Sequence, residues 1–397
     1  MPKSSHLGIY LGLGLFCLLL VGYFLYAGDF VTASDYTVPI YGSLGATTSL
    51  EKIETKKRVH LATPEPVKAI YMTSWVASTP SLRNRVVNLI KDTEINAVVI
   101  DVKDDTGKVS FTTDNQIITK IGSTENRIRD LATIIEDLHK DDIYVIARIA
   151  TFQDPYLAKV RPDLAVLRSG DGAVWKDRKG LSWVDPGAEE VWEYVAEIAK
   201  EAHELGFDEI NFDYIRFPSD GDLRNLTYPH SNLASTTRSA VIKNFFSYID
   251  KTLEPLGVPL SADLFGMTTT TFDDMNIGQI FENALPYFDY VSPMIYPSHY
   301  PPHFNGYADP NEAPYEIIKY VMDSAVKRAI AASSSPDKIR PWLQDFDYPV
   351  TYTVADVKAQ KQAVYDAGLT SWLMWDPSNT YTREAYDSAV LTKPVSN

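Results

Sequence analysis

Residues 207–218, which read FDEINFDYIRFP, carry the residue types best suited to acid–base chemistry. The pattern predicts a short buried strand that ends at Asp213, with Asn211 and Asp213 on one face because side chains in a strand alternate. Arg216 and the terminating Pro218 follow within a few positions. A carboxylate at the carboxyl end of a strand, beside a cation and aromatic rings, suits cleavage of a glycosidic bond. The alternative is an aspartate that only caps the loop after the strand.

Similar apolar runs recur along the chain and predict eight strands, at 68–75, 97–102, 143–150, 209–214, 259–264, 290–296, 339–345 and 370–376. Amphipathic helical patterns follow them, at 81–93, 125–140, 188–205, 236–256, 277–285, 314–332, 354–367 and 382–391. Eight strand–helix units in succession predict an α/β fold, a (β/α)8 TIM barrel over residues 67–397. A doubly wound open sheet is the alternative, but no G-x-G-x-x-G motif opens the first unit.

TIM-barrel enzymes build their active sites at the carboxyl ends of the strands. The residues expected at those ends are, in chain order, Trp75, Asp101, Arg148, Asp213, Asp263, Tyr296, Asp345 and Asp376. Aspartate dominates this set, although it is unfavourable in strands and costly to bury without a partner. An aspartate at a strand end can also cap the next helix. We therefore expect only part of the set to be functional.

Asp213 and Asp263 form the best candidate pair because they end neighbouring strands, which lie about 4.8 Å apart. Glycoside hydrolysis needs two carboxyl groups, one acting as an acid and the other as a nucleophile or base. Their surroundings must push the two pKa values apart. Arg216 or Arg148 could keep one carboxylate ionised, while the apolar surroundings of Leu264 could raise the pKa of the other. The sequence leaves open which aspartate is the acid.

Several motifs resemble a family of bacterial glycoside hydrolases that is distantly related to the α-amylase-type barrels. The motifs are YMTSWVAS (71–78), VVIDVKDDTGKVSF (98–111), FDYIRFPSDG (212–221), SADLFG (261–266), SPMIYPSHY (292–300), RPWLQDF (340–346) and SWLMWDPSN (371–379). The resemblance covers nearly all of residues 67–395, and FDYIRFP is its most specific part. It implies a glycosidase with a TIM-barrel fold.

The likeness to amylase-type barrels implies that Asp213 is the nucleophile, that strand five supplies the acid, and that Asp345 stabilises the transition state. Two positions depart from that pattern. Asn211 stands where those enzymes carry an arginine, and Asp263 stands where they carry a glutamate. A shorter acid changes the separation of the carboxyl groups, so a retaining mechanism is not implied. The remaining strand-end residues and two of their neighbours are expected to bind the sugar, with the aromatic ones as stacking platforms. These residues are Trp75, Tyr296, Asp101, Arg148 and Asp376, with Arg216 and Trp375 as the two neighbours.

Metal sites are poorly supported by the sequence. His299 and His303 are four residues apart, but the prolines between them oppose the helix that such a zinc site needs. Asp101, Asp104 and Asp105 lack the spacing of an EF-hand loop. We therefore expect no metal and no cofactor. Two alternatives to a glycosidase remain, a catalytically silent barrel that binds glycans and a metal-dependent deacetylase of surface polysaccharide.

The net charge of −15 argues against a nucleic-acid partner, which would need basic patches. It also disfavours polyanionic substrates, although a local arginine could overrule the net charge. The 24 Tyr and seven Trp residues suit stacking on sugar rings, while most of them are expected in the core. The expected partner is therefore a polysaccharide or oligosaccharide.

The N-terminal residues 1–28 include an uncharged apolar run at 7–28, long enough to span a bilayer. We expect a single-pass anchor with the catalytic domain outside the cytoplasm of a bacterial cell; the alternative is a signal peptide cleaved after Ala33, giving a secreted protein. Residues 29–66 are polar and aperiodic and predict a linker. The one cysteine, Cys17, excludes a disulfide framework.

Overall fold

Residues 58–389 are described by the computed structural model, and they confirm the predicted TIM barrel. Eight parallel strands close on themselves in the order β1-β10-β9-β8-β7-β5-β3-β2. Their bounds are β1 (Lys68–Met72), β2 (Ala97–Lys103), β3 (Tyr144–Ala150), β5 (Glu209–Asp213), β7 (Leu260–Phe265), β8 (Tyr290–Met294), β9 (Trp342–Gln344) and β10 (Trp372–Trp375). All eight predicted strands are therefore present, most of them shortened at one end or both.

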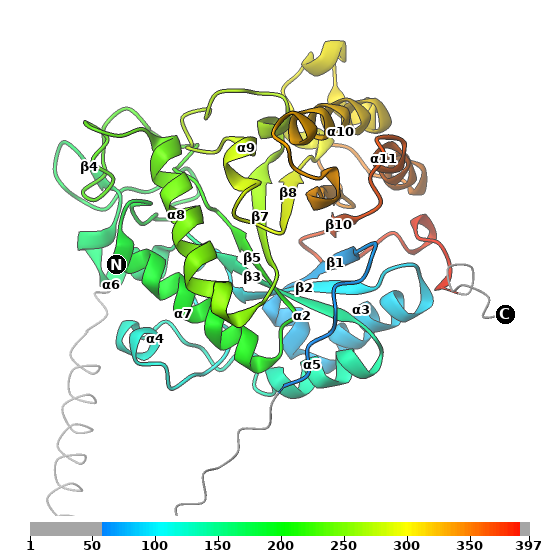
Figure 1. The fold of residues 1–397 in the computed structure, drawn as a ribbon, viewed down its shortest axis with the longest axis horizontal. Coiled ribbons are helices and arrows are strands. Elements are labelled where there is room, and N and C mark those ends of the chain that lie inside the picture. The colour runs from blue at the N-terminus through cyan, green and yellow to red at the C-terminus, as the bar shows by residue number, and fades with distance from the viewer. Residues whose placement is uncertain (1–57, 390–397) are drawn as a thin grey trace, which may run out of the picture. The chain divides into compact units, whose positions relative to one another are not determined.

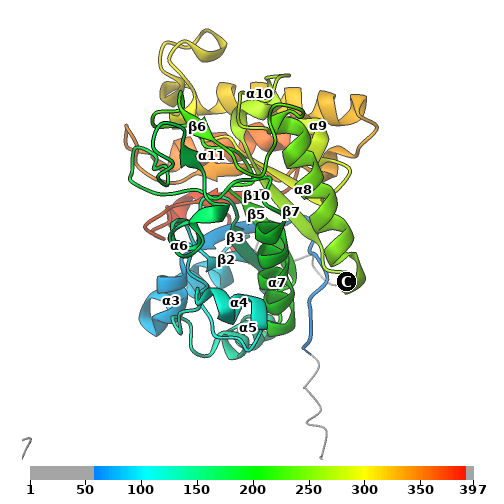
Figure 2. The same cartoon turned by 90° about the vertical axis from the view of Figure 1, so that its left-hand side faces the viewer.

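Helices surround the strands, which occupy the centre of the view in Figure 1. They are α2 (Ser74–Ser78), α3 (Pro80–Asp92), α4 (Gln116–Ile121), α5 (Leu131–Lys140), α6 (Pro155–Val160), α7 (Glu189–Leu205), α8 (Arg238–Leu253), α9 (Phe281–Ala284), α10 (Pro314–Ala331) and α11 (Val354–Asp366). Helices α7 and α8 lie side by side in both views (Figures 1 and 2). Each covers the outer face of the barrel with an apolar stripe.

Helix α7 illustrates how the sequence produces this layer. Its buried residues include Val191, Val195, Ile198 and Ala202, which recur at the three- and four-residue spacing of one helical face. Gly206 ends the helix with φ at 113°, a conformation that costs glycine little because it has no Cβ. The next strand, β5, can therefore begin three residues later and run back along the barrel.

The possible eighth helix, 382–391, does not form over residues 382–388, where a 3-10 turn, Arg383–Ala385, stands instead. The backbone is held by other contacts instead, because Lys361 donates to the Ala385 carbonyl at 2.8 Å and Ser388 bridges to Thr93 in an antiparallel pair. These bonds tie the segment to α11 and to the turn before β2, and they compete with helical hydrogen bonds.

The strand residues divide by parity into two separate apolar clusters. One cluster lies inside the barrel and includes Ala69, Tyr71, Val99, Ile146 and Trp342. The other joins the intervening residues to the helices, as with Ile70, Val98, Ala147 and Leu343. Strand alternation therefore decides whether a residue at a strand end faces the barrel axis or the helix layer.

The last part of the predicted linker packs against the amino-terminal end of the barrel. Leu61 donates its backbone N–H to Asp208 at 2.7 Å and joins the cluster inside the barrel. The Thr63 and Tyr144 hydroxyl oxygens lie 3.0 Å apart. Residues 58–66 thus belong to the barrel domain, whereas the linker was predicted to extend to residue 66.

Two long loops, here called the rim loops, stand at the carboxyl end of the barrel. They comprise residues 151–188, after β3, and residues 214–237, after β5. They pair through the short antiparallel strands β4 (Leu167–Arg168) and β6 (Leu226–Thr227). The carboxylate of Asp185 also accepts hydrogen bonds from the backbone N–H groups of His230 and Ser231 at 2.6 and 3.2 Å.

Within residues 58–389, every helix is too short or too polar to cross a bilayer. The predicted anchor, 7–28, and the predicted cleavage site after Ala33 lie outside the described residues.

Candidate active site

A pocket of about 560 Å³ opens at the carboxyl ends of the strands, and we call it the barrel pocket. Its walls come from β3, β5, β7, β8, β9 and β10 and from the loops that follow them. Among the predicted site residues, it contains Arg148, Asp213, Arg216, Asp263, Tyr296 and Trp375. Residues spread over more than 200 sequence positions therefore meet in one cavity.

Arg148 lies at the centre of the charged groups. Its Nη1 donates to Asp101 Oδ1 at 2.6 Å, and its Nη2 donates to Asp213 Oδ2. Its Nε lies 3.8 Å from Asp263 Oδ2. Burial alone would lower the pKa of this guanidinium, but the negative charges of Asp213 and Asp101 outweigh burial and raise it. One cation therefore serves three buried carboxyl groups.

Asp263 and Asp213 lie at the same height on neighbouring strands, because each stands two residues after the paired residues Asn211 and Ser261. Its Oδ1 accepts from Asn211 Nδ2 at 2.9 Å and from Trp342 Nε1 at 2.8 Å. The residue is only 1% exposed. Burial raises the pKa of its carboxyl well above the usual range, and the charge of Asp213 raises it further.

Asp213 differs because it has a full cationic partner, the Arg148 guanidinium. The next residue, Tyr214, has φ at 53°, which is rare for a bulky side chain. Such strained residues cost about 1–3 kcal/mol and cluster at functional sites. The turn places the Tyr214 side chain on the pocket wall, where burial raises the pKa of its hydroxyl to about 12.

Aromatic rings form one wall of the barrel pocket. The ring of Trp375 stacks on Tyr71 with centroids 3.9 Å apart, and Trp342 meets it edge-on at 5.5 Å. The guanidinium of Arg148 lies 5.0 Å from the centroid of Trp375. Tyr296 also lines the cavity. Flat rings next to buried carboxyl groups are the arrangement expected of a sugar-binding subsite.

Three predicted aspartates lie outside the barrel-pocket lining. Asp101 faces inward but is occupied by Arg148 and the Tyr71 hydroxyl. Asp345 faces the helix layer and accepts from the Tyr386 hydroxyl at 2.7 Å and the Thr382 N–H at 2.9 Å. Asp376 accepts from the Ser378 N–H at 2.6 Å.

The parity of the strands explains the positions of Asp345 and Asp376. Trp342 and Trp375 contact the interior cluster, so the residues at odd offsets from them face outward. The sequence analysis placed both aspartates correctly at the carboxyl ends of their strands, but the side chains face outward and not toward the barrel axis. The geometry favours structural roles for them, as anchors of the segments that follow β9 and β10.

Trp75 is also displaced from its predicted place at the end of β1. The strand ends at Met72, and Thr73 caps α2 by accepting the Val76 N–H. Trp75 therefore projects from this short helix, 63% exposed, with the Arg127 guanidinium 4.4 Å from its ring centroid. It stands outside the barrel pocket as an isolated surface ring.

Sequence reasoning gave no site role to three residues that line the pocket, namely Lys179, Tyr214 and Trp342. Trp342 could have been found, because it stands two positions before Gln344 on the inward parity of β9. The others lie on loops, whose paths a strand pattern does not predict. Burial lowers the pKa of His299, and the positive charge of Lys179 lowers it further.

The described part of the chain contains no group of three His, Cys, Asp or Glu residues placed to hold a metal ion. His299 Nδ1 lies 3.0 Å from the Ser298 hydroxyl. Asp104 pairs with Arg127, and Asp101 pairs with Arg148. Members of both candidate metal groups, His299 in one and Asp101 and Asp104 in the other, thus contact other side chains.

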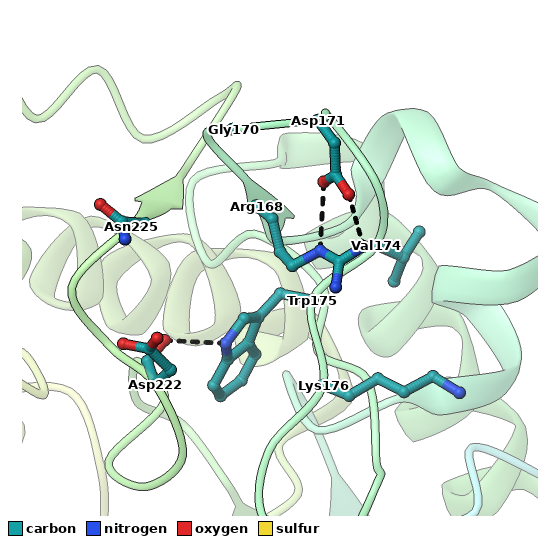
Figure 3. A pocket seen from close by; sticks show the side chains of 8 residues that line it. All are labelled: Arg168, Gly170, Asp171, Val174, Trp175, Lys176, Asp222 and Asn225. Carbon is teal, nitrogen blue, oxygen red and sulfur yellow. Dashed lines mark hydrogen bonds and ion pairs between the residues drawn. The ribbon is translucent and has the colours of Figure 1, made fainter.

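A second hollow, of about 660 Å³, lies between the rim loops (Figure 3). Several of its polar groups pair with one another, since Arg168 pairs with Asp171 and the Trp175 indole N–H donates to the Asp222 carbonyl at 3.0 Å. Asp171, Asp222 and Arg168 are surface groups screened by solvent. It lacks the buried, interacting carboxyl groups that distinguish the barrel pocket.

Comparison with solved structures agrees with this architecture. A hypothetical protein from Ruminiclostridium thermocellum is 36% identical, with 49% of this chain and 96% of that chain covered and a TM-score of 0.45. The PgaB (BpsB) glycoside hydrolase domain from Bordetella bronchiseptica is 13% identical, with 81% and 99% covered and a TM-score of 0.57. The catalytic domain of β-amylase from Paenibacillus polymyxa is 11% identical, with 83% and 97% covered and a TM-score of 0.51. At these identities the last two show a shared fold.

No curated protein matches the chain. A family model described as "Putative glycosyl hydrolase domain" matches residues 69–381, which include every strand of the barrel except the first residue of β1. The resemblance noted in the sequence is thereby confirmed, and the chain belongs to this family of glycoside hydrolases.

Proposed function

We propose that this enzyme hydrolyses glycosidic bonds of a cell-surface or cell-wall polysaccharide, with Asp213 and Asp263 as its two working carboxyl groups. The observation that carries the proposal is their unequal environment around one guanidinium. Asp213 pairs directly with Arg148, whereas Asp263 is more deeply buried and lies farther from that cation. Two carboxyl groups whose protonation states differ are what acid–base cleavage of a glycoside requires.

In this mechanism Asp263 is the general acid. Its Oδ1 already accepts two N–H groups, so the proton belongs on Oδ2. Burial raises the pKa of this carboxyl, which favours its protonated form. It donates this proton to the glycosidic oxygen as the bond to the anomeric carbon breaks.

Asp213 acts as the nucleophile or as the base that activates water. Its Oδ2 accepts from Arg148 Nη2, and its Oδ1 accepts from the Tyr214 N–H at 2.5 Å. Both contacts fix the direction of the carboxylate toward the pocket. A nucleophile would give retention at the anomeric carbon, and a base would give inversion. The anomer that is released first distinguishes the two.

Trp375 and Tyr296 serve as the sugar-stacking walls of the subsite, and Trp75 is a separate stacking ring outside the pocket for longer chains. The predicted anchor at 7–28 belongs to the proposal as well, because its uncharged length suits a bilayer. It would hold the catalytic domain outside the cytoplasm. Membrane fractionation and N-terminal sequencing of the mature protein test this part, since a mature chain starting at Ser34 would indicate a secreted enzyme.

The test of the reaction is hydrolysis of a panel of bacterial and plant polysaccharides by the full chain, with sizing of the products. The expected result is one class of glycan cleaved by the wild type and left intact by Asp213→Asn. Binding without cleavage by the wild type would instead indicate a glycan-binding barrel. Loss of activity with a chelator and recovery with zinc would favour the deacetylase alternative.

A further inference from the structure

Arg216 is a buried cation with no carboxylate partner among residues 58–389. It is 8% exposed and lines the barrel pocket. Its Nη1 donates to the Phe217 carbonyl at 3.0 Å and to the Ser219 hydroxyl at 3.1 Å. The rings of Trp183 and Phe265 each lie 4.7 Å from its guanidinium carbon. Two rings and one short segment thus hold the side chain in place beside the cavity.

Its environment contrasts with that of Arg148, the other arginine of the pocket. Arg148 contacts three carboxyl groups, whereas Arg216 forms no ion pair within residues 58–389. Asp213 and Asp220 favour its charge only from a distance, and burial lowers its pKa. A buried charge usually has a hydrogen-bonded counter-ion, because aromatic faces replace only part of its hydration.

A second polar group on the same wall also lacks a partner. Tyr300 is buried and lines the pocket, and its hydroxyl makes no hydrogen bond in the described part of the chain. Gly266 follows Phe265, whose ring contacts Arg216, and a Cβ built on Gly266 would lie 2.7 Å from the Tyr300 hydroxyl oxygen. Glycine at this position therefore lets the backbone approach the Tyr300 hydroxyl closely.

We propose that Arg216 and the Tyr300 hydroxyl bind a carboxylate carried by a sugar residue of the substrate. The proposal rests on the glycosidase function and specifies its substrate class. The planar fork of a guanidinium matches two carboxylate oxygens, and the hydroxyl supplies a further donor. Asp105 and Asp220 also line the pocket, and their charges disfavour a dianionic group such as a phosphate ester. The net charge of −15 is thus overruled locally.

Binding of small sugars by the full chain tests this inference separately from hydrolysis. The probes are D-glucuronate, D-galacturonate and N-acetylmuramate, each paired with its neutral parent, D-glucose, D-galactose or N-acetylglucosamine. We expect at least one acid to bind about 10- to 100-fold more tightly than its parent, as a charge-assisted pair in a buried site should. Arg216→Met should abolish that preference, because it should weaken binding of the acid far more than binding of the neutral parent.

Tyr300→Phe provides a milder variant that keeps the ring, and it should reduce the preference severalfold. Arg216→Gln, which keeps a donor without the charge, guards against misfolding of the methionine variant. Equal affinity for every acid and its parent would overturn the inference, and so would an acid preference that persists in both Arg216 variants.

A glycan that the enzyme cleaves gives the second readout. Reduction of its carboxyl groups to alcohols should lower kcat/KM about 10- to 100-fold for the wild type and have no further effect on Arg216→Met. Cleavage of a neutral glycan, with no preference for acids, would keep the glycosidase function and refute the carboxylate subsite. Preferential binding of acids without cleavage of any glycan would keep the carboxylate subsite and refute the glycosidase function.

Discussion

The two ends of the barrel both bury charged groups, but they differ in how these groups are paired. At the amino-terminal end, the Glu209 carboxylate accepts from Arg340 at 2.9 Å and from the Tyr144 hydroxyl at 3.2 Å. Asp208 accepts from the Val145 N–H at 2.8 Å and lies 2.9 Å from His139 Nε2. Each carboxylate there has its own set of donors.

At the carboxyl end, Asp101, Asp213 and Asp263 share the guanidinium of Arg148, while Arg216 forms no ion pair with any described residue and bonds to the Phe217 carbonyl and the Ser219 hydroxyl. Charges that are paired one to one stabilise a structure. Carboxyl groups that share one cation can change their protonation state, and a cation without a counter-ion can bind a ligand. The difference indicates that charge imbalance, more than burial, separates the reacting end of this barrel from the supporting end.

The largest expected effect comes from removing the charge of Asp213. Asp213→Asn should lower kcat by about 10⁴-fold or more, because no neighbouring group can replace the carboxylate. The melting temperature should stay close to that of the wild type, since Arg148 keeps its bond to Asp101. Asp345→Asn is the matched control, also at a strand end but facing the helices, and its turnover per folded molecule should be nearly normal. Normal turnover in Asp213→Asn together with loss of turnover in Asp345→Asn would make Asp345 the catalytic residue and Asp213 the structural one.

Arg340→Met tests the supporting end. It leaves Glu209 buried without its cation and should lower the free energy of unfolding by about 3–5 kcal/mol. The kcat of the remaining folded enzyme should change little. Combining it with Glu209→Gln should recover much of the loss, because the uncompensated charge is gone. Urea denaturation and turnover numbers provide both measurements, and a selective loss of kcat would contradict the proposed division between the ends.

Asp263→Asn should change how stability depends on pH. The pKa of Asp263 is raised in the folded state, so its contribution to stability is fully present below the unfolded value of about 3.9. That contribution is lost as pH rises through the folded pKa. The asparagine variant lacks this loss, so its stability relative to the wild type should increase with pH. Denaturation midpoints measured from pH 3 upward decide the question, and parallel curves would mean that the carboxyl is ionised throughout.

The pH dependence of catalysis should agree with that titration. If Asp263 is the acid, Asp263→Asn should lose the basic limb of the kcat/KM profile. Substrates with a good leaving group should suffer less than natural glycans, because they need little protonation. Equal loss on both substrates would assign Asp263 another role.

The smallest effect is expected outside the pocket, at Trp75. Trp75→Ala should raise KM for long glycans about 2- to 10-fold and leave short substrates unaffected, as loss of one stacking ring should. Its exposed position predicts a change in stability within about 0.5 kcal/mol. An effect on short substrates would place the ring nearer to the reacting bond than the structure does.

The sequence predicted the strands and the Asp213–Asp263 pair because alternation and chain order are local properties. The same alternation would have turned Asp345 and Asp376 outward had it been applied from Trp342 and Trp375. The Thr73 cap of α2 would likewise have shortened the first strand and moved Trp75. These errors were avoidable.

Other features have no local signal. The positive φ of Tyr214 is imposed by tertiary contacts, since propensity disfavours it. The missing partner of Arg216 becomes visible only when every surrounding residue is placed. The packing of residues 58–66 under the barrel also depends on Asp208 and Tyr144, far along the chain.

The pairing of the rim loops has an evolutionary consequence. Because β4 pairs with β6 and a Cβ at Gly187 would lie 2.5 Å from the Ser231 Cα, neither loop can change length without breaking contacts with the other. Insertions and deletions in the two loops should therefore occur together among members of the family. New specificities would then arise by replacing the pair as one exchangeable module, while the eight strands beneath it stay as they are.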